Sequence, residues 1–198
     1  MEQKVNPAHL TDKVQPCIEK GLDLEKRRKS LVARLRAGNH DAAEELVEMY
    51  HEQIYLYMRR LGHSRQNSED LTQESFIQAW QHIGQLRDGS SLNGWLYRIA
   101  GNASCVYWRN NKNRKTASMD GFDVGDGSDS HESLGDFELL ENLNEAVSAL
   151  PRKFHEPVVL HYMQHLTIRE AAEALGIREG TCKSRLSRAL DSLRKQII

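Results

Sequence analysis

The sequence predicts an all-α protein of two small helical domains, an N-terminal helical bundle and a C-terminal helix-turn-helix, joined by a flexible acidic linker. Apolar residues recur at three- and four-residue intervals in one segment after another, which is the spacing of amphipathic helices. No segment shows the alternation that is typical of strands. A Gly-, Ser- and Asp-rich stretch with little to bury divides the helical segments into two groups. We therefore expect an N-terminal arm over residues 1–28, a first domain over 29–112, a linker over 113–138 and a second domain over 139–198.

The first domain follows an arm in which Pro16 interrupts a short apolar helical pattern. From Ser30 the helical spacing becomes regular, and Gly62 is placed to end the first long helix. The residues of that helix expected to face inward are Ala43, Leu46, Val47, Tyr50, Ile54, Tyr57, Met58 and Leu61.

Two further helices complete the predicted bundle. Asn67 or Ser68 is expected to cap the second helix. The third helix runs from about Leu92 to Arg109, after a loop over 84–91 that contains Gly and Ser. The residues expected to face inward are Leu71, Phe76, Ala79, Trp80 and Ile83 in the second helix, and Leu92, Trp95, Leu96, Ile99, Ala103 and Val106 in the third.

The charges are segregated, although the formal net charge is only −1. Residues 98–119 contain Lys and Arg but no acid, and the final helix is basic again. Between them lie nine acids and no Lys or Arg: Asp120, Asp123, Asp126, Asp129, Glu132, Asp136, Glu138, Glu141 and Glu145. This order indicates two DNA-facing modules separated by an acidic tether.

The second domain ends in the pattern of a helix-turn-helix. Apolar spacing resumes over 139–150, and the next helix contains Pro157, which is expected to kink that helix or to mark its start. Residues 167–175 then form a short amphipathic helix, Gly176 supplies a turn, and residues 178–194 form a helix rich in cations and hydroxyls. This arrangement lays a recognition helix in the major groove of DNA.

Composition excludes several classes of protein. Hydrophobic residues make up 39% and charged residues 28% of the chain, which fits a globular domain and not a disordered one. No run approaches the roughly 18 apolar residues of a membrane span, and no charged-then-apolar leader opens the chain, so a cytoplasmic protein without membrane association is expected. Cys17, Cys105 and Cys182 lie too far apart in the sequence to indicate a disulfide framework.

Sequence runs in both halves point to one family. They are DLTQESFIQAW at 70–80, WLYRIA at 95–100 with Asn102 after it, Leu150-Pro151, residues 166–177, and GTCKSRLSRAL at 180–190. With these runs the chain resembles the bacterial RNA polymerase sigma factors, specifically the small two-domain extracytoplasmic-function (ECF) group. The chain departs from the family pattern at Val106, where an acid is common, at Cys182, where valine is usual, and at Gly101, where Arg is frequent. These departures bear on promoter preference.

The resemblance implies a subunit with no catalytic residue, metal or cofactor of its own. Its partners would be the bacterial RNA polymerase core, promoter DNA and an anti-sigma factor. It implies that the second helix docks on polymerase through Asp70, Gln73, Glu74 and Gln78. It also implies that the third helix and the preceding loop melt the downstream promoter element, and the candidates are Arg87, Asn93, Tyr97, Arg98, Asn102, Trp108 and Arg109. The candidates for reading duplex DNA are Arg178, Thr181, Lys183, Ser184, Arg185 and Arg188.

Other interpretations stand beside this one. The polar face of the second helix and the basic face of the last helix also suit plain solvated surface, and Tyr97 and Trp108 also suit core packing. The chain could be a dimeric helix-turn-helix regulator, or a metal hydrolase using His161 and His165, for which no third ligand is apparent. The linker acids could mimic phosphates in polymerase channels or act simply as a tether.

Overall fold

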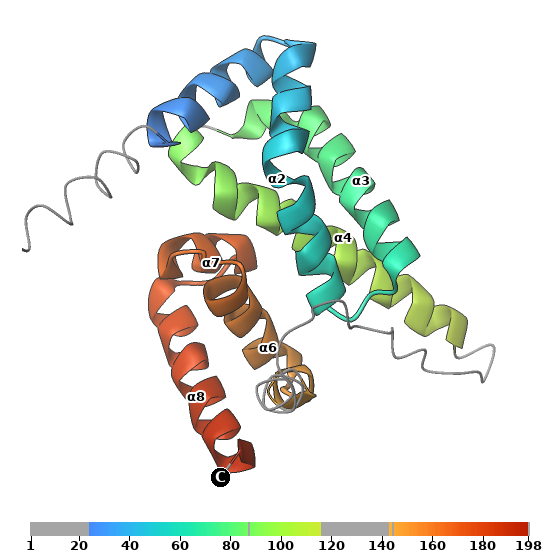
Figure 1. The fold of residues 1–198 in the computed structure, drawn as a ribbon, viewed down its shortest axis with the longest axis vertical. Helices are drawn as coiled ribbons and strands as arrows, with labels where there is room; N and C mark the ends of the chain where they lie inside the picture. Colours follow the sequence, from blue (N-terminus) through green and yellow to red (C-terminus); the bar gives the residue numbers. More distant parts are fainter. Residues whose placement is uncertain (1–23, 87, 116–142, 144, 198) are drawn as a thin grey trace, which may run out of the picture.

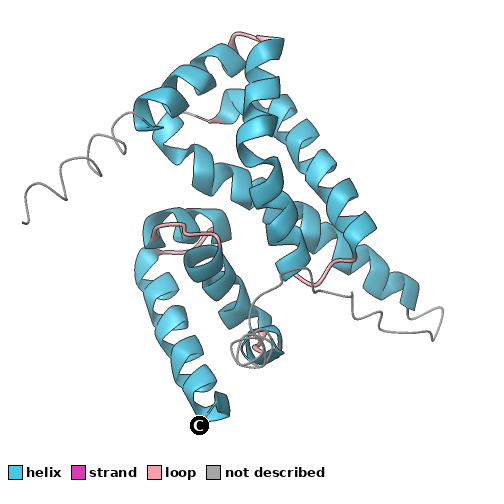
Figure 2. Cartoon of the chain, in the orientation of Figure 1, coloured by secondary structure: helices cyan, strands magenta, loops and turns pink. Residues whose placement is uncertain are grey.

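The computed structural model describes residues 24–86, 88–115, 143 and 145–197. Helices and the short loops between them make up these residues, and no strand occurs among them (Figure 2). The predicted all-α fold with two helical domains is confirmed. Most of the expected acidic linker, residues 116–138, and the candidate Arg87 lie outside the described residues.

The first domain is a bundle around one core (Figure 1). It comprises a helix over residues 24–36, α2 (His40–Arg60), α3 (Arg65–His82) and α4 (Leu92–Lys115), with 3-10 turns at Ile83–Gln85 and Gly89–Ser91. Ile54, Met58 and Leu92 are fully buried, as their spacing predicts. Val47 and Val106 were expected to face inward but are 38% and 44% exposed, because they lie at the edge of the buried stripe.

The helix over residues 24–36 crosses the expected boundary between the arm and the first domain. Leu31 and Leu35 are buried in the core, and Glu45 of α2 forms ion pairs with two arginines of this helix. The sequence signal is weak at the start of this helix because residues 25–30 are all polar or charged. Residues on both sides of the expected boundary therefore contact α2.

α3 begins earlier than the predicted caps. Ser64 is the N-cap, and its hydroxyl accepts a hydrogen bond of 3.3 Å from the backbone N–H of Asn67. Ser68 is fully buried inside the helix, where its hydroxyl donates to the His63 carbonyl at 3.4 Å. Ser68 thus helps to fix the turn between α2 and α3 instead of capping α3.

α4 begins at Leu92 as predicted but ends at Lys115, past both Arg109 and the expected domain boundary at residue 112. Residues 110–115 contain neither Gly nor Pro that would stop a helix. They also carry three cations, which are favourable at a helix C-terminus.

The second domain consists of a helical turn over residues 145–148, α6 (Arg152–Val158), a π-helical turn (Val159–Met163), α7 (Ile168–Leu175) and α8 (Glu179–Ile197). Pro157 lies in the last turn of α6 and does not mark the start of the helix. Proline lacks an N–H and crowds the preceding turn, which favours a local change of helix type. The wider turn follows directly, and the N–H of Gln164 donates to the carbonyl of Val159 at 2.9 Å.

The two domains are in direct contact, because α7 packs against α4 (Figure 1). Their buried apolar residues form one hydrophobic cluster that extends from Leu31 to Leu193. The hydrogen bonds across the contact include Arg60 Nη1 to the Met163 carbonyl at 2.7 Å, Asn93 Nδ2 to Glu170 Oε1 at 2.9 Å, and the Tyr97 hydroxyl with the Gln164 amide at 3.0 Å.

Candidate nucleic-acid interface

Residues at both ends of α7 fix where the first helix of the helix-turn-helix begins and ends. The Thr167 hydroxyl accepts from the backbone N–H of Glu170 at 3.2 Å, and the Glu170 carboxylate accepts from the backbone N–H of Thr167 at 2.9 Å. The two residues therefore form a reciprocal capping box. Gly176 ends the helix at a φ of 63°, in the left-handed region that glycine adopts without steric cost. The predicted helix-turn-helix is confirmed.

Five of the six candidate recognition residues share one face, four of them on α8 and Arg178 directly before its first residue. Arg178, Thr181, Ser184 and Arg188 are exposed, and Arg185 is half-buried. Lys183 lies on the other flank of the helix, where it lines a pocket of about 280 Å³ beside His161 and Tyr162. The structure thus separates Lys183 from the other candidates.

Cys182 packs in the core between the two flanks of α8. Its side chain is fully buried, and burial raises the pKa of its thiol. A protonated, inaccessible thiol behaves as a small apolar residue. It can therefore occupy the position where valine was expected without disturbing the exposed recognition face.

α4 presents a polar stripe to solvent. Arg98, Asn102 and Arg109 are exposed and lie on one face by their helical spacing. Cys105 is exposed on the same stripe, and its sulfur accepts a hydrogen bond of 2.6 Å from Arg152 Nη2 of α6. The second domain therefore reaches this stripe of the first.

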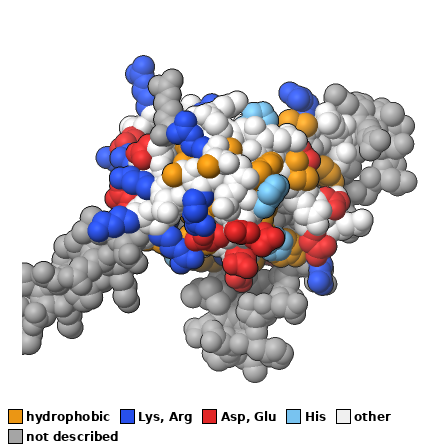
Figure 3. All heavy atoms as spheres, turned by 90° about the horizontal axis from the view of Figure 1, so that it is seen from above, with side chains coloured by type: hydrophobic (Ala, Val, Ile, Leu, Met, Phe, Trp, Pro, Cys, Tyr) orange, Lys and Arg blue, Asp and Glu red, His pale blue; other side chains and the backbone are white. Residues whose placement is uncertain are grey.

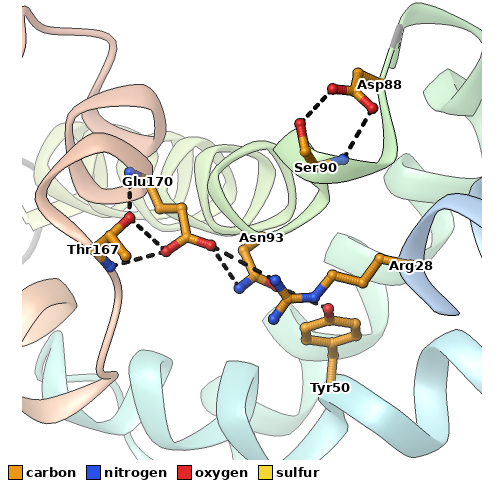
Figure 4. Close-up of polar contacts among 7 residues, drawn as sticks. All are labelled: Arg28, Tyr50, Asp88, Ser90, Asn93, Thr167 and Glu170. Carbon is orange, nitrogen blue, oxygen red and sulfur yellow. Dashed lines mark hydrogen bonds and ion pairs between the residues drawn. The ribbon is translucent and has the colours of Figure 1, made fainter. Parts of the chain in front are cut away.

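Two other candidates on α4 contact the second domain instead of solvent. Tyr97 is 1% exposed and packs edge-on against Tyr57, with ring centroids 5.2 Å apart. Burial raises the pKa of its hydroxyl, which stays protonated in its hydrogen bond with Gln164. Asn93 uses both ends of its amide, because Oδ1 accepts from the Tyr50 hydroxyl at 2.8 Å and Nδ2 donates to Glu170 (Figure 4).

Trp108 is the exposed aromatic of α4, and a buried histidine supports it. The ring of His63 stacks on Trp108 with centroids 4.9 Å apart, and its Nε2 lies 2.7 Å from the buried hydroxyl of Ser104. Burial, with the nearby Arg152 guanidinium, lowers the pKa of His63 to about 4. Sequence reasoning missed His63, whose only signal is an isolated histidine in the turn after Gly62.

The candidate docking residues lie together on the outer face of α3. Asp70, Gln73 and Glu74 are exposed, and the half-buried Gln78 donates to the Glu74 carboxylate at 2.6 Å. Ile77 lies among them and is 53% exposed. Protein-binding surfaces combine an apolar centre with a polar rim, and Ile77 with its polar neighbours has this composition. The sequence analysis did not single out Ile77.

The helix over residues 24–36 supplies a second group of cations. Lys26, Arg27 and Arg36 are exposed on it. Seen from this end of the molecule, Lys and Arg side chains gather along one side, with acidic side chains among them (Figure 3). Residues 24–28 of this basic helix were expected to belong to the arm and the rest to the first domain, and the charge of the helix was missed as a functional signal.

The two histidines considered as a metal site lie apart from any further metal ligand. Within the described ranges, no three His, Cys, Asp or Glu side chains come close enough together to hold a metal ion. His161 instead pairs its Nδ1 with the Leu166 carbonyl at 2.7 Å, and His165 adopts a φ of 56° in the following turn. None of the helices described is both long and apolar enough to cross a membrane.

Comparison with known families gives two matches in chain order. The family described as Sigma-70 region 2 matches residues 46–114, which cover α2 to α4. The family described as Sigma-70, region 4 matches residues 140–193, which include the helix-turn-helix.

Two similar proteins of known family match most of this chain. The chain is 30% identical to the ECF RNA polymerase sigma factor SigW of Bacillus subtilis over 179 residues, covering 85% of this chain and 96% of SigW. It is 32% identical to SigM of the same organism over 155 residues, covering 76% of this chain and 92% of SigM.

Two solved structures share the fold. One is CnrH in complex with the cytosolic domain of CnrY, with a TM-score of 0.64 and 21% identity, covering 84% of this chain and 94% of that chain. The other is the sigma factor RpoE of Bartonella quintana in complex with the anti-sigma factor NepR, with a TM-score of 0.66 and 23% identity, covering 77% and 94%. Together with the two family matches and the relatives in Bacillus subtilis, the fold leads to one conclusion: this chain belongs to the ECF sigma factors, which bind RNA polymerase core and direct transcription initiation at specific promoters.

Proposed function

We propose that this sigma factor holds promoter DNA at two points with residues on separate helices. The exposed face of α8 reads the upstream duplex element, and α4 with the loop before it binds the melted downstream element. The observation that carries the proposal is the polar and cationic face formed by Arg178, directly before α8, and by Thr181, Ser184, Arg185 and Arg188 of α8, behind a capped, Gly-terminated α7. A helix presented in this way fits the major groove.

The downstream site would combine charge and stacking. Arg98 and Arg109 suit phosphates, Asn102 suits a base edge, and the partly exposed Trp108 offers a ring face to an unpaired base. His63 would act as a positioning residue that holds the Trp108 ring in place. The cations of the helix over residues 24–36 add positive charge to the same domain.

The polymerase-docking surface would be the outer face of α3. Asp70, Gln73 and Glu74 offer acceptors and donors to a polar partner, and Ile77 offers apolar area at their centre. Apolar residues at the centre of an interface contribute most of its affinity, whereas exposed charges mainly set specificity. We expect Ile77→Asp to weaken core binding more than Gln73→Ala.

We further propose that an anti-sigma factor regulates the chain and that the chain acts in the cytoplasm, without enzymatic activity. Support for the partner comes from the two structural neighbours, whose complexes contain CnrY and the anti-sigma factor NepR. The location follows from that of the polymerase and DNA on which the chain would act. As domain boundaries we propose the residues expected from the sequence, with the first domain extended at both ends to include the helix over residues 24–36 and the whole of α4.

The decisive experiment is reconstitution. The purified chain is added to bacterial core polymerase free of sigma factor, with a random-sequence DNA pool as template, and the transcripts are sequenced. We expect transcripts that share a start position and two upstream sequence elements. Absence of both core binding and shared transcripts would refute the proposal, and dimers that bind palindromic DNA without polymerase would favour a conventional helix-turn-helix regulator.

The role of α8 has a quantitative test on the promoter selected in this way. If Arg188 contacts a phosphate, Arg188→Ala should reduce the slope of log affinity against log salt by about one, without changing sequence preference. If it contacts a base, discrimination at one position should fall by roughly 1–3 kcal/mol. Lys195→Ala, which removes an exposed cation near the end of the same helix, is the matched control. Equal behaviour of the two variants would exclude Arg188 from the interface.

A further inference from the structure

The chain between α3 and α4 is anchored in the core at both ends. Leu86 is 3% exposed, and Leu92, the first residue of α4, is fully buried. Residues 88–91 lie between these anchors and include the 3-10 turn Gly89–Ser91. We call residues 88–91 the entry turn. It belongs to the loop that, with α4, is proposed to bind the melted downstream element.

Hydrogen bonds within the entry turn fix its shape. One carboxylate oxygen of Asp88 accepts from the backbone N–H of Ser90 at 3.2 Å, and the other accepts from the Ser90 hydroxyl (Figure 4). These bonds hold the pKa of the Asp88 carboxyl below its usual range. The N–H of Ser91 donates to the Asp88 carbonyl at 3.1 Å. All of these contacts are internal, so they do not determine where the turn lies relative to the rest of the domain.

A backbone contact with another helix determines that position. Gly89 is buried, and a Cβ added to it would lie 2.6 Å from the Cα and 2.8 Å from the backbone N of Lys29. Both are backbone atoms, so no change of side-chain rotamer could relieve the overlap. Only glycine therefore lets the entry turn lie this close to the helix over residues 24–36.

That helix is itself held firmly in the domain. Leu31 and Leu35 are buried in the core, and Glu45 of α2 pairs with Arg27 and Arg34. The Lys29 side chain is 53% exposed, and its ammonium group pairs with Glu25 at 2.8 Å. Lys29 therefore meets the entry turn with its backbone, while its charge is directed elsewhere.

We propose that the helix over residues 24–36 is a specificity-determining element of this chain, because its backbone at Lys29 sets through Gly89 where the entry turn meets an unpaired base. Gly89 is then a positioning residue that acts through its neighbours in the turn. The inference rests on the proposed role of the loop before α4. Hydrogen bonds to a base edge require donor and acceptor to be placed within a few tenths of an ångström, whereas phosphate contacts tolerate a shift. A displaced turn should consequently lose base preference before it loses DNA affinity.

Gly89→Ala tests this in the reconstituted holoenzyme. Promoters that carry each of the four bases at every position of the selected downstream element are compared for open-complex formation. In the variant, the preference for the best base should fall by roughly fivefold or more at the position that the turn reads, as expected when a base contact is lost. Preferences in the upstream element and binding to core polymerase should not change, because α8 and α3 lie away from the turn.

Two matched variants serve as controls. Gly84→Ala adds the same methyl group in the turn before Leu86, outside the entry turn, where no atom lies within 4 Å. It should keep the wild-type base preference. Lys29→Ala removes a cation but keeps the backbone that contacts Gly89, so any loss of affinity should be equal for all four bases.

Hydrogen exchange of the wild-type chain gives a test that needs no variant. If the helix holds the entry turn, the Ser91 N–H should exchange only when the helix opens. The free energy of opening measured at Ser91 should then match the values at Leu31 and Leu35. An exposed turn without such support exchanges much faster than a buried helix.

The outcomes distinguish this inference from the proposed function. A wild-type base preference in Gly89→Ala, an equal loss of preference in Lys29→Ala, or rapid exchange at Ser91 while Leu31 stays protected would each overturn the positioning role. If Gly89→Ala does not fold, the exchange measurement alone decides. If the wild type accepts all four bases equally throughout the downstream element, the proposed role of the loop is wrong and the inference fails with it.

Discussion

At the scale of single residues, His63 shows how a buried neutral group supports an exposed functional one. It lies beside the Ser104 hydroxyl, edge-to-face with the Tyr107 ring and stacked on the Trp108 ring, where water has little access. A charged imidazolium in this position would lose hydration, and the nearby guanidinium of Arg152 would repel it. The neutral ring is therefore the form that packs against Trp108.

The stability of the protein should consequently depend on pH through His63. Its pKa falls from 6.5 to about 4 on folding, so the unfolded chain binds more protons in this range. The contribution is complete above pH 6.5 and is lost as the pH falls toward 4. Between pH 6.5 and 5 we expect the free energy of unfolding to decrease by about 1–2 kcal/mol from this group.

Urea unfolding at pH 5 and pH 7.5 measures this effect, with His63→Gln as the comparison. Glutamine keeps a polar partner for Ser104 but does not titrate. His155, whose pKa burial also lowers, remains in both proteins and cancels in the difference. An equal pH dependence in the two proteins would show that His63 is not the titrating group.

At the scale of elements, a few residues close together in the sequence determine where α7 begins and where it ends. Thr167 and Glu170 satisfy N–H groups at its start, and Gly176 turns the chain at its end. These signals are local in sequence, so the helix-turn-helix could be predicted with its boundaries. They also fix the angle at which α8 leaves the turn.

Gly176→Ala should therefore lower the free energy of unfolding by about 1 kcal/mol, because a Cβ is unfavourable in the left-handed region. Gly176→Asn should cost less, since asparagine tolerates this conformation. Chemical denaturation of both variants measures the difference. No atom lies within 4 Å of a Cβ at this position, so a steric clash cannot account for a loss. Equal stability of Gly176→Ala and the wild type would contradict this account of the turn.

Signals that depend on distant packing were harder to predict. The spacing of α4 placed Arg98, Asn102 and Arg109 on one face correctly. The same spacing placed Tyr97 with Trp108 on the next face and left open whether it contacts DNA or packs in the core, because nothing in the sequence shows that Gln164 and Tyr57 enclose it. The helix over residues 24–36 was missed for a related reason. Its helical state depends on burying Leu31 and its neighbours against a core that forms elsewhere in the chain.

At the scale of the whole molecule, the two domains share one core although their family matches are separate. Unfolding either domain would expose the apolar surface of the contact and would remove the hydrogen bonds from Arg60 to Met163 and from Asn93 to Glu170. The free energy of the contact therefore couples the two unfolding reactions. The sequence predicted two domains and a tether, and it contained no sign of this coupling.

Calorimetry should show one unfolding transition for the wild-type chain. A Cβ added at Gly94 of α4 would lie 3.0 Å from the Glu170 carbonyl oxygen of α7, so Gly94→Ala should weaken the contact between the domains. In this variant the transition should broaden or divide into two. Gly84→Ala should keep the single transition. Two well-separated transitions in the wild type would mean that the contact contributes little to stability.

The double use of Glu170 has a consequence for how such a chain can diverge. One oxygen of its carboxylate caps α7 and the other contacts the neighbouring domain, so a substitution of this residue alters both the helix and the contact between the domains. Arg28 contacts only the second oxygen and belongs to a different helix. Drift at Arg28 can therefore adjust the strength of the contact between the domains while the helix-turn-helix keeps its fold, so single substitutions in one domain can change how tightly it is coupled to the other.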